Sequence, residues 1–196
     1  MKKTQHQDSI AGMNPRAGHG SGIAWQVTGN RTGKTCSSKQ CKGGLNFWQT
    51  LKLRLFSIIK IPMLGYVRPV VKRVDDAGAH VVIPLSYRTK NHVASMYFGA
   101  LSVGADLCIG LVGIYHINQT QKKLNLVFKD FKINFFKKAY QDVHFVCEEG
   151  DKVKKLVDKS VKTAKRQNGR IHGHAFVLKN AAKDIVAEFD LTLSIK

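Results

Sequence analysis

The chain has 196 residues and a formal net charge of +19, a size that accommodates one domain with a hydrophobic core and a tail. The charge favours anionic partners such as nucleic acid, membrane surfaces or phosphorylated ligands, without selecting among them. Four residues separate Cys36 from Cys41, and no matching pair or histidine set lies near them, which excludes a typical zinc site. We therefore expect a reduced, cytoplasmic protein.

Residues 1–44 are rich in Gly, Ser and Asn and contain one acidic residue, Asp8. Such a composition cannot form a core, so we expect a disordered basic tail. It lacks the apolar run of a secretory signal, so we expect no export by that route; Met13 is a later candidate start. The run from Gly29 to Thr35 is similar to a phosphate-binding loop, but that motif requires glycine at Thr28 and a flanking strand and helix, so we reject it.

The next segment, Leu45 to Met63, predicts an amphipathic helix that Pro62 ends, because apolar residues recur at helical spacing with basic residues between them. Packing over the edge of the domain is the favoured interpretation, and peripheral membrane contact is the alternative. The Val-rich runs Tyr66 to Asp75 and Ala79 to Leu85 then predict two strands. Asp75 to Gly78 has the composition of a hairpin turn between them.

The stretch from Asn91 to His116 is the most apolar part of the chain. Asp106 is its one acidic side chain, and an unpaired buried carboxylate is costly, so we expect it to be neutralised, hydrogen-bonded or functional. In a helix, small residues would share a face with this acid, against which a substrate, a strand or a second subunit could pack; they are Gly99, Ser102, Gly110 and Gly113. A membrane span is the alternative, but the glycines and the acid argue against it. A second alternative is that Asp106 only makes a hydrogen bond to a neighbouring element.

Four further strands are predicted, at Leu124 to Phe136, Val143 to Glu148, Arg170 to Lys179 and Ile185 to Ile195. In the last one alternate residues face the core, whereas Glu188, Asp190, Thr192 and Ser194 face water. Asp151 to Gln167 predicts a basic surface helix that ends at Asn168-Gly169, with phosphate binding as the alternative. The sum is an α+β domain in which a curved antiparallel sheet wraps around the central helix. Its free edge could pair with a second subunit.

The motif from Asn91 to Asp106 and the order of elements resemble the hotdog-fold acyl-CoA thioesterases of the phenylacetyl-CoA type. The resemblance covers residues 46–196 and is strongest to a branch of unknown function. That branch's motif reads Asn-His, Met-Tyr and Gly-Ala-Leu; here these are Asn91-His92, Met96-Tyr97 and Gly99-Ala100-Leu101. The resemblance implies a hotdog domain over residues 45–196 that forms a homodimer, or a tetramer, and needs no cofactor or metal.

The resemblance also implies roles for individual residues. The backbone N–H groups at Phe98 and Gly99 would stabilise the oxyanion of a thioester, and Asp106 from the other subunit would act as base or nucleophile. Asn91 would orient water or substrate. Further substrate contacts are assigned to Tyr97, Ser102 and Lys129.

Two departures from the family pattern keep a second hypothesis open. Tyr97 stands where the family has His, and Phe98 stands where it has the first glycine of the turn, although an N–H group survives any side chain. The first hypothesis is an acyl-CoA thioesterase, and the second is a non-catalytic hotdog dimer that binds acyl thioesters or lipids. A nucleic-acid or anionic-surface binder is the third, but no specific nucleic-acid motif supports it.

Overall fold

The computed structural model describes residues 50–51 and 61–196. The expected tail at 1–44 and most of the expected helix at 45–63 therefore lie outside the described residues. Thr50 and Leu51 are helical, Ile61 is not, and the short helix α2 (Pro62–Val67) follows. Pro62 occupies the first turn of α2, where its missing N–H group costs no hydrogen bond. Pro62 thus begins a helix of its own.

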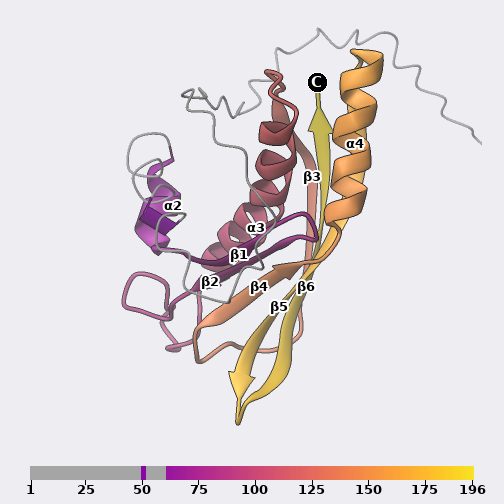
Figure 1. Ribbon diagram of the computed structural model, residues 1–196. Helices are drawn as coiled ribbons and strands as arrows, with labels where there is room; N and C mark the ends of the chain where they lie inside the picture. Colours follow the sequence, from indigo (N-terminus) through magenta and orange to yellow (C-terminus); the bar gives the residue numbers. More distant parts are fainter. Residues whose placement is uncertain (1–49, 52–60) are drawn as a thin grey trace, which may run out of the picture.

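The described residues form one six-stranded antiparallel sheet in the order β1-β2-β4-β5-β6-β3, curved around helix α3 (Phe98–Gln119) (Figure 1). Helix α4 (Gly150–Thr163) lies beside α3 and packs against it and β5. This confirms the predicted α+β architecture. The strands are β1 (Val70–Val74), β2 (Ala79–Ile83), β3 (Leu126–Phe135), β4 (Val143–Cys147), β5 (Gln167–Lys179) and β6 (Ala182–Ile195).

Helix α3 is the centre of the core because it is apolar on nearly every side. Ala105, Cys108, Ile109 and Val112 are completely buried in it. Among the described residues, α3 is the one helix long and apolar enough to cross a membrane, and 56% of its most apolar window is buried inside the fold. The sheet curves around α3, so the length and hydrophobicity of this helix are accounted for by packing within the domain.

The small residues of α3 let side chains of the sheet approach the helix axis. A Cβ atom on Gly113 would lie 2.3 Å from Leu126 Cδ1, and one on Gly104 would lie 2.4 Å from the Phe145 ring. Gly110 faces the Phe128 ring at an ordinary contact distance. Side chains of β3 therefore pack against Gly110 and Gly113, which belong to the small-residue face that we expected to contact a substrate, a strand or a second subunit.

Several element boundaries differ from the predictions by a few residues, and two of the differences follow from left-handed residues. The strand expected from Tyr66 begins at Val70, because Tyr66 lies in α2 and Arg68 ends that helix with φ 49°. The basic helix expected to end at Gln167 ends at Thr163, where Ala164 takes φ 51°. Because the helix ends there, Gln167 is the first residue of β5.

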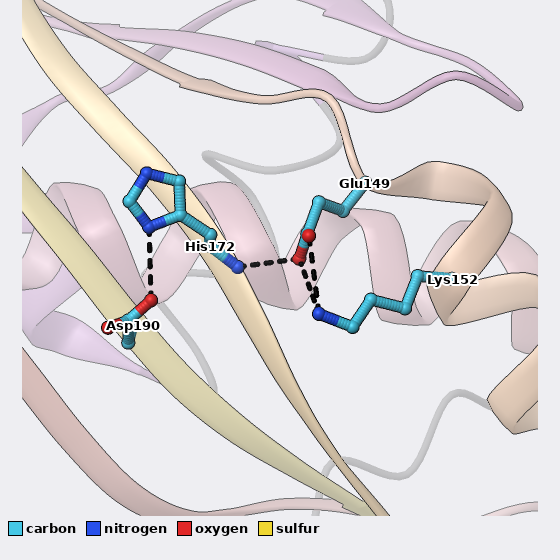
Figure 2. A network of polar contacts seen from close by, with 4 residues as sticks. All are labelled: Glu149, Lys152, His172 and Asp190. Atoms are coloured by element: carbon cyan, nitrogen blue, oxygen red, sulfur yellow. Dashed lines mark hydrogen bonds and ion pairs between the residues drawn. The ribbon is translucent and has the colours of Figure 1, made fainter.

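A small polar network ties the start of α4 to β5 (Figure 2). The Glu149 carboxylate accepts the backbone N–H of His172 at 2.7 Å and contacts Lys152 Nζ at 3.2 Å. His172 Nδ1 lies 3.0 Å from Asp190 Oδ1. Because β4 pairs with β5 only over His174 to Phe176, the N–H of His172 has no partner on β4, and Glu149 supplies the acceptor.

The water-facing side of β6 is correctly predicted except at its end. Glu188 is exposed and Asp190 and Thr192 are partly exposed, but Ser194 is only 3% exposed. The reason is Arg166, whose Nη1 donates to Ser194 Oγ at 3.1 Å and covers it. The expectation that Ser194 faces water is therefore wrong.

Candidate functional site

A pocket of about 560 Å³ lies at the N-terminal end of α3. The loop after β2 and the loop between β3 and β4 meet there, where the N–H of Met96 donates to the Ala139 carbonyl at 2.8 Å. Most of the lining is apolar or aromatic, with cations on one side. The lining residues are Asn91, His92, Ser95, Met96, Tyr97, Phe98, Leu101, Phe135, Phe136, Lys137, Lys138 and Ala139.

Asn91 holds the loop that leads into α3. Its Oδ1 accepts the N–H groups of Val93 at 3.0 Å and Ser95 at 3.2 Å, and its Nδ2 donates to Ser95 Oγ at 3.0 Å. The Asn91 carboxamide is therefore engaged mainly within its own loop, a common use of asparagine in turns. In this structure Asn91 positions the loop at the pocket wall.

The start of α3 leaves two backbone donors without an acceptor. Tyr97 precedes the helix, and its carbonyl accepts the N–H groups of Ala100 and Leu101. Within the described part of the chain, no acceptor reaches the N–H groups of Phe98 and Gly99. The helix dipole adds a positive partial charge at the same place, so this end of the pocket suits a developing negative charge.

The aromatic ring of Tyr97 folds back over the first turn of α3. A Cβ atom on Gly99 would lie 2.5 Å from Tyr97 Cε1, so only glycine leaves space for the ring. The rings of Tyr97 and Phe98 are 4.7 Å apart between centroids, and both side chains are about half exposed at the mouth of the pocket. The two residues that depart from the family pattern thus form the rim.

Asp106 lies two turns further along α3 and is largely buried. Burial raises the pKa of its carboxyl from 3.8 to about 6. Its side chain makes no hydrogen bond or ion pair with residues 50–51 or 61–196, so it has no structural partner among them. Asp106 is eight positions after Phe98, about 12 Å along the helix axis, and does not line the pocket of its own subunit.

Two further predicted residues lie outside the pocket. Ser102 Oγ donates to the Phe98 carbonyl at 3.0 Å within the helix. Lys129 is exposed at an irregularity in β3, between Phe128 and Asp130. Of the predicted site residues, the structure brings Asn91, Tyr97 and Phe98 together, with Gly99 beneath the Tyr97 ring.

The sequence reasoning missed the second wall of the pocket. Phe135, Phe136 and Lys138 line it, and Lys137 beside them pairs with Asp184. The available signal was the run of two aromatic and two basic residues at the end of a predicted strand, a combination suited to a ligand with an apolar part and an anionic part.

The edge strand β3 carries an apolar face that α3 leaves uncovered. Phe131, Ile133 and Phe135 pair with Leu191, Phe189 and Ala187, which are buried in the core, so all six face the same side as α3. Phe131 is nevertheless 41% exposed and Phe135 is 44% exposed. The edge of β3 that points away from β6 has no strand partner within the described residues.

The site can therefore stabilise an anion at the helix start and hold an apolar group beside it. The described residues contain no cluster of three or more His, Cys, Asp or Glu side chains that could hold a metal ion. Among the described carboxylates, Asp106 is the one whose pKa is raised towards neutrality, which suits a general base.

Solved structures with the same fold are known. One is a protein of unknown function from Chlorobaculum tepidum TLS, with a TM-score of 0.64 and 13% identity over 75% of this chain and 93% of that one. A second, from Pseudomonas aeruginosa, is described as a probable thioesterase, with a TM-score of 0.62 and 16% identity over 75% and 95%. A third, a thioesterase family protein from Silicibacter pomeroyi, has a TM-score of 0.52 and 11% identity over 74% and 97%.

These similarities show that the domain has the hotdog fold of thioesterase-like proteins, which confirms the expected fold. No curated protein matches the sequence. The family described as a domain of unknown function, DUF4442, matches residues 51–195, and this chain belongs to it.

Proposed function

We propose that this protein is a thioesterase that hydrolyses an acyl-CoA or a related thioester. The observation that carries the proposal is the pairing of two features on one helix. Phe98 at the start of α3 lines the pocket, and the N–H groups of Phe98 and Gly99 have no acceptor among the described residues. The same helix carries a largely buried, unpartnered carboxylate, Asp106. A buried, unpaired acid is costly, so a catalytic use explains its presence.

A homodimer would bring the two features together. The open edge of β3 would pair with the same strand of a second subunit, and the uncovered rings of Phe131 and Phe135 would then pack against the partner. A two-fold axis at this edge places the two α3 helices beside each other in opposite directions. Asp106 of one subunit would thereby approach the start of α3 in the other.

The proposed reaction is addition of water to the thioester carbonyl. The carboxylate of Asp106 takes a proton from the water, and the resulting hydroxide forms a bond to the carbonyl carbon. The oxyanion accepts hydrogen bonds from the N–H groups of Phe98 and Gly99. Its collapse breaks the carbon–sulfur bond, and the proton held by Asp106 passes to the thiolate. Direct attack by the carboxylate is the alternative route.

The lining of the pocket supports a ligand with an apolar acyl group and an anionic leaving group. Phe135, Phe136 and Met96 would contact the acyl chain. The exposed ammonium group of Lys138 lies at the pocket wall, where it could meet a phosphate.

The test is thiol release from short, medium, long and aromatic acyl-CoAs. We expect Asp106→Asn to lower kcat by at least about 100-fold, since a general base contributes about 10²–10⁴. Phe98→Pro removes one backbone donor at a helix position where proline is tolerated, and we expect a further loss of about 100-fold. Phe98→Ala keeps the N–H group and is the matched control. No turnover by the wild type on any acyl-CoA, or turnover unaffected by Asp106→Asn, contradicts the proposal.

A non-catalytic dimer that binds acyl thioesters or lipids is the second candidate. The Tyr97 ring favours it, because the ring lies across Gly99 at the place where the thioester carbonyl would enter. This candidate predicts saturable binding of acyl-CoA without thiol release. It also predicts that Asp106→Asn leaves the affinity unchanged.

A further inference from the structure

Six exposed aromatic side chains lie on segments that carry the pocket or contact it, and three of them, Tyr97, Phe98 and Phe136, line it. They come from α2, the loop after β2, the start of α3 and the loop between β3 and β4. We call them the aromatic end face; they are Tyr66, Tyr87, Tyr97, Phe98, Phe136 and Tyr140, between 48% and 86% exposed. Exposed aromatic side chains that gather on neighbouring segments of a folded protein are typical of an interaction site.

The segments that carry the aromatic end face contact one another directly. The Arg88 guanidinium lies 5.6 Å from the centre of the Tyr66 ring, which joins the loop after β2 to α2. The N–H of Leu85 donates to Asp142 Oδ1 at 2.8 Å, which joins the same loop to the end of the β3–β4 connection. In Figure 1, α2 and the loop after β2 lie on the same side of the domain, away from α4. The segments that carry the six rings are therefore neighbours in the fold.

The most exposed ring, that of Tyr87, is presented by a fixed turn. The N–H groups of Thr89 and Lys90 both donate to the Ser86 carbonyl at 3.0 Å. Thr89 is completely buried, and its hydroxyl donates to the Pro84 carbonyl at 2.7 Å. Tyr87 is nevertheless 86% exposed, so the outward position of the ring is set by the fold of its turn.

Cations accompany these rings, and acids are nearly absent. Residues 84–98 and 135–142 contain Arg88, Lys90, Lys137 and Lys138 but a single acid, Asp142, which already accepts the Leu85 N–H. Lys137 pairs with Asp184. Lys90 and Lys138 are exposed, and no carboxylate among the described residues pairs with either ammonium group.

We propose that the aromatic end face docks onto an anionic membrane surface. Tyrosine and phenylalanine rings partition to the headgroup region, and neighbouring Lys and Arg side chains are attracted to lipid phosphates. Docking there turns the mouth of the pocket, lined by Tyr97 and Phe98, towards the lipid. Three rings, Tyr66, Tyr87 and Tyr140, lie outside both the pocket lining and the open edge strand β3, so neither substrate nor a partner strand accounts for their exposure. Membrane docking does not require the pocket to be catalytic.

The test is sedimentation of the full chain with phosphatidylcholine vesicles that contain or lack phosphatidylglycerol, at physiological ionic strength. We expect the combined change Lys90→Ser and Lys138→Ser to weaken binding to anionic vesicles by about 20-fold, since each cation at the surface contributes about fivefold. The matched control removes two exposed lysines from α4, Lys155→Ser and Lys159→Ser. It should change binding by less than about twofold, because charges farther than a Debye length from the lipid are screened.

A second pair of variants tests the rings themselves. Tyr87→Ser with Tyr140→Ser should weaken vesicle binding while leaving acyl-CoA binding unchanged, because neither residue lines the pocket. A Tyr87→Trp variant should show quenching of its added fluorescence by brominated lipids. Equal losses from the end-face and α4 lysine pairs would overturn the proposal, because binding would then follow net charge alone. Unchanged vesicle binding, or a change of oligomeric state, in the double tyrosine variant would also overturn it, the latter by assigning the face to a second copy of the chain.

Discussion

Asp106 carries a free-energy cost in the folded chain. Burial raises the pKa of its carboxyl from 3.8 to about 6, so the ionised form is disfavoured inside the fold relative to the unfolded chain. Below pH 3.8 the acid is neutral in both states and the cost is absent. As the pH rises from 3.8 to about 6 the unfolded chain ionises first, stability falls, and the cost then stays constant at higher pH.

This cost predicts that Asp106→Asn stabilises the protein. The amide has nearly the same shape and no charge to desolvate, so we expect a gain of about 1–3 kcal/mol in the free energy of unfolding at pH 7. Urea denaturation of both proteins at pH 7 and at pH 4 measures it. The gain should largely disappear at pH 4. A variant that is less stable at pH 7 would mean that Asp106 has a structural partner, and would remove the energetic argument for its function.

Helix α3 shows how much packing depends on single missing methyl groups. A Cβ atom on Gly104 would lie 2.4 Å from the ring of Phe145, which is completely buried, whereas one on Gly110 would lie 3.5 Å from Phe128 Cζ. Both glycines are buried in the same helix, so they form a matched pair. The close approach at Gly104 leaves the Phe145 ring no space to yield.

We predict opposite effects for alanine at these two positions. Gly104→Ala should destabilise the fold by about 1–3 kcal/mol, because the core is overpacked. Gly110→Ala should be neutral or stabilising by up to about 1 kcal/mol, because alanine favours the helix and the new methyl group makes an ordinary contact. Thermal denaturation of the two variants measures the difference. Equal effects would show that α3 does not sit at this depth against β4.

The order of elements could be predicted because apolar periodicity is a local property of the chain. The hairpin at Asp75 to Gly78 is an example, since Asp75 Oδ1 accepts the N–H groups of Ala77 and Gly78 within four residues. The ends of α2 and α4 could not be predicted in the same way. They depend on Arg68 and Ala164 in left-handed conformations, which residues other than glycine rarely adopt.

The candidate site likewise combines residues that a local motif relates with residues that only the tertiary fold brings together. Phe98 and Asp106 lie on one helix and Tyr97 directly precedes it, so a motif in the sequence could relate them. The opposite wall at Phe136 and Lys138 comes from a loop that reaches the pocket through tertiary pairing with Met96, and no local pattern records that contact. Asn91 was assigned a role towards substrate, whereas its hydrogen bonds in the structure are made within its own loop.

At the scale of the whole molecule, several histidines are held neutral by the fold. Burial lowers the pKa of His80 to about 4, with nearby His144 and the cations Arg73 and Lys72 adding to the effect. Burial also lowers the pKa of His116, His144 and His174. Below pH 6.5 the unfolded chain binds protons that the folded chain does not.

Acid should therefore destabilise the protein in the window between pH 6.5 and about 4. We predict a fall in Tm across this window that becomes shallower in His80→Gln, which removes one of the responsible groups. The same fall should be steeper in Asp106→Asn, because Asp106 takes up a proton in the folded state below pH 6 and partly offsets the histidines. Thermal scans in matched buffers test this, and a slope that His80→Gln leaves unchanged contradicts it.

The central claim is that a site contains the α3 amides of one subunit and Asp106 of the other, and a mixing experiment tests it directly. Asp106→Asn and Phe98→Pro, each inactive alone, would be unfolded together, refolded and assayed for acyl-CoA hydrolysis. If half of the dimers are mixed and each has one intact site, activity should return to about 25% of the wild-type value. A mixture as inactive as its components would contradict a site shared between subunits.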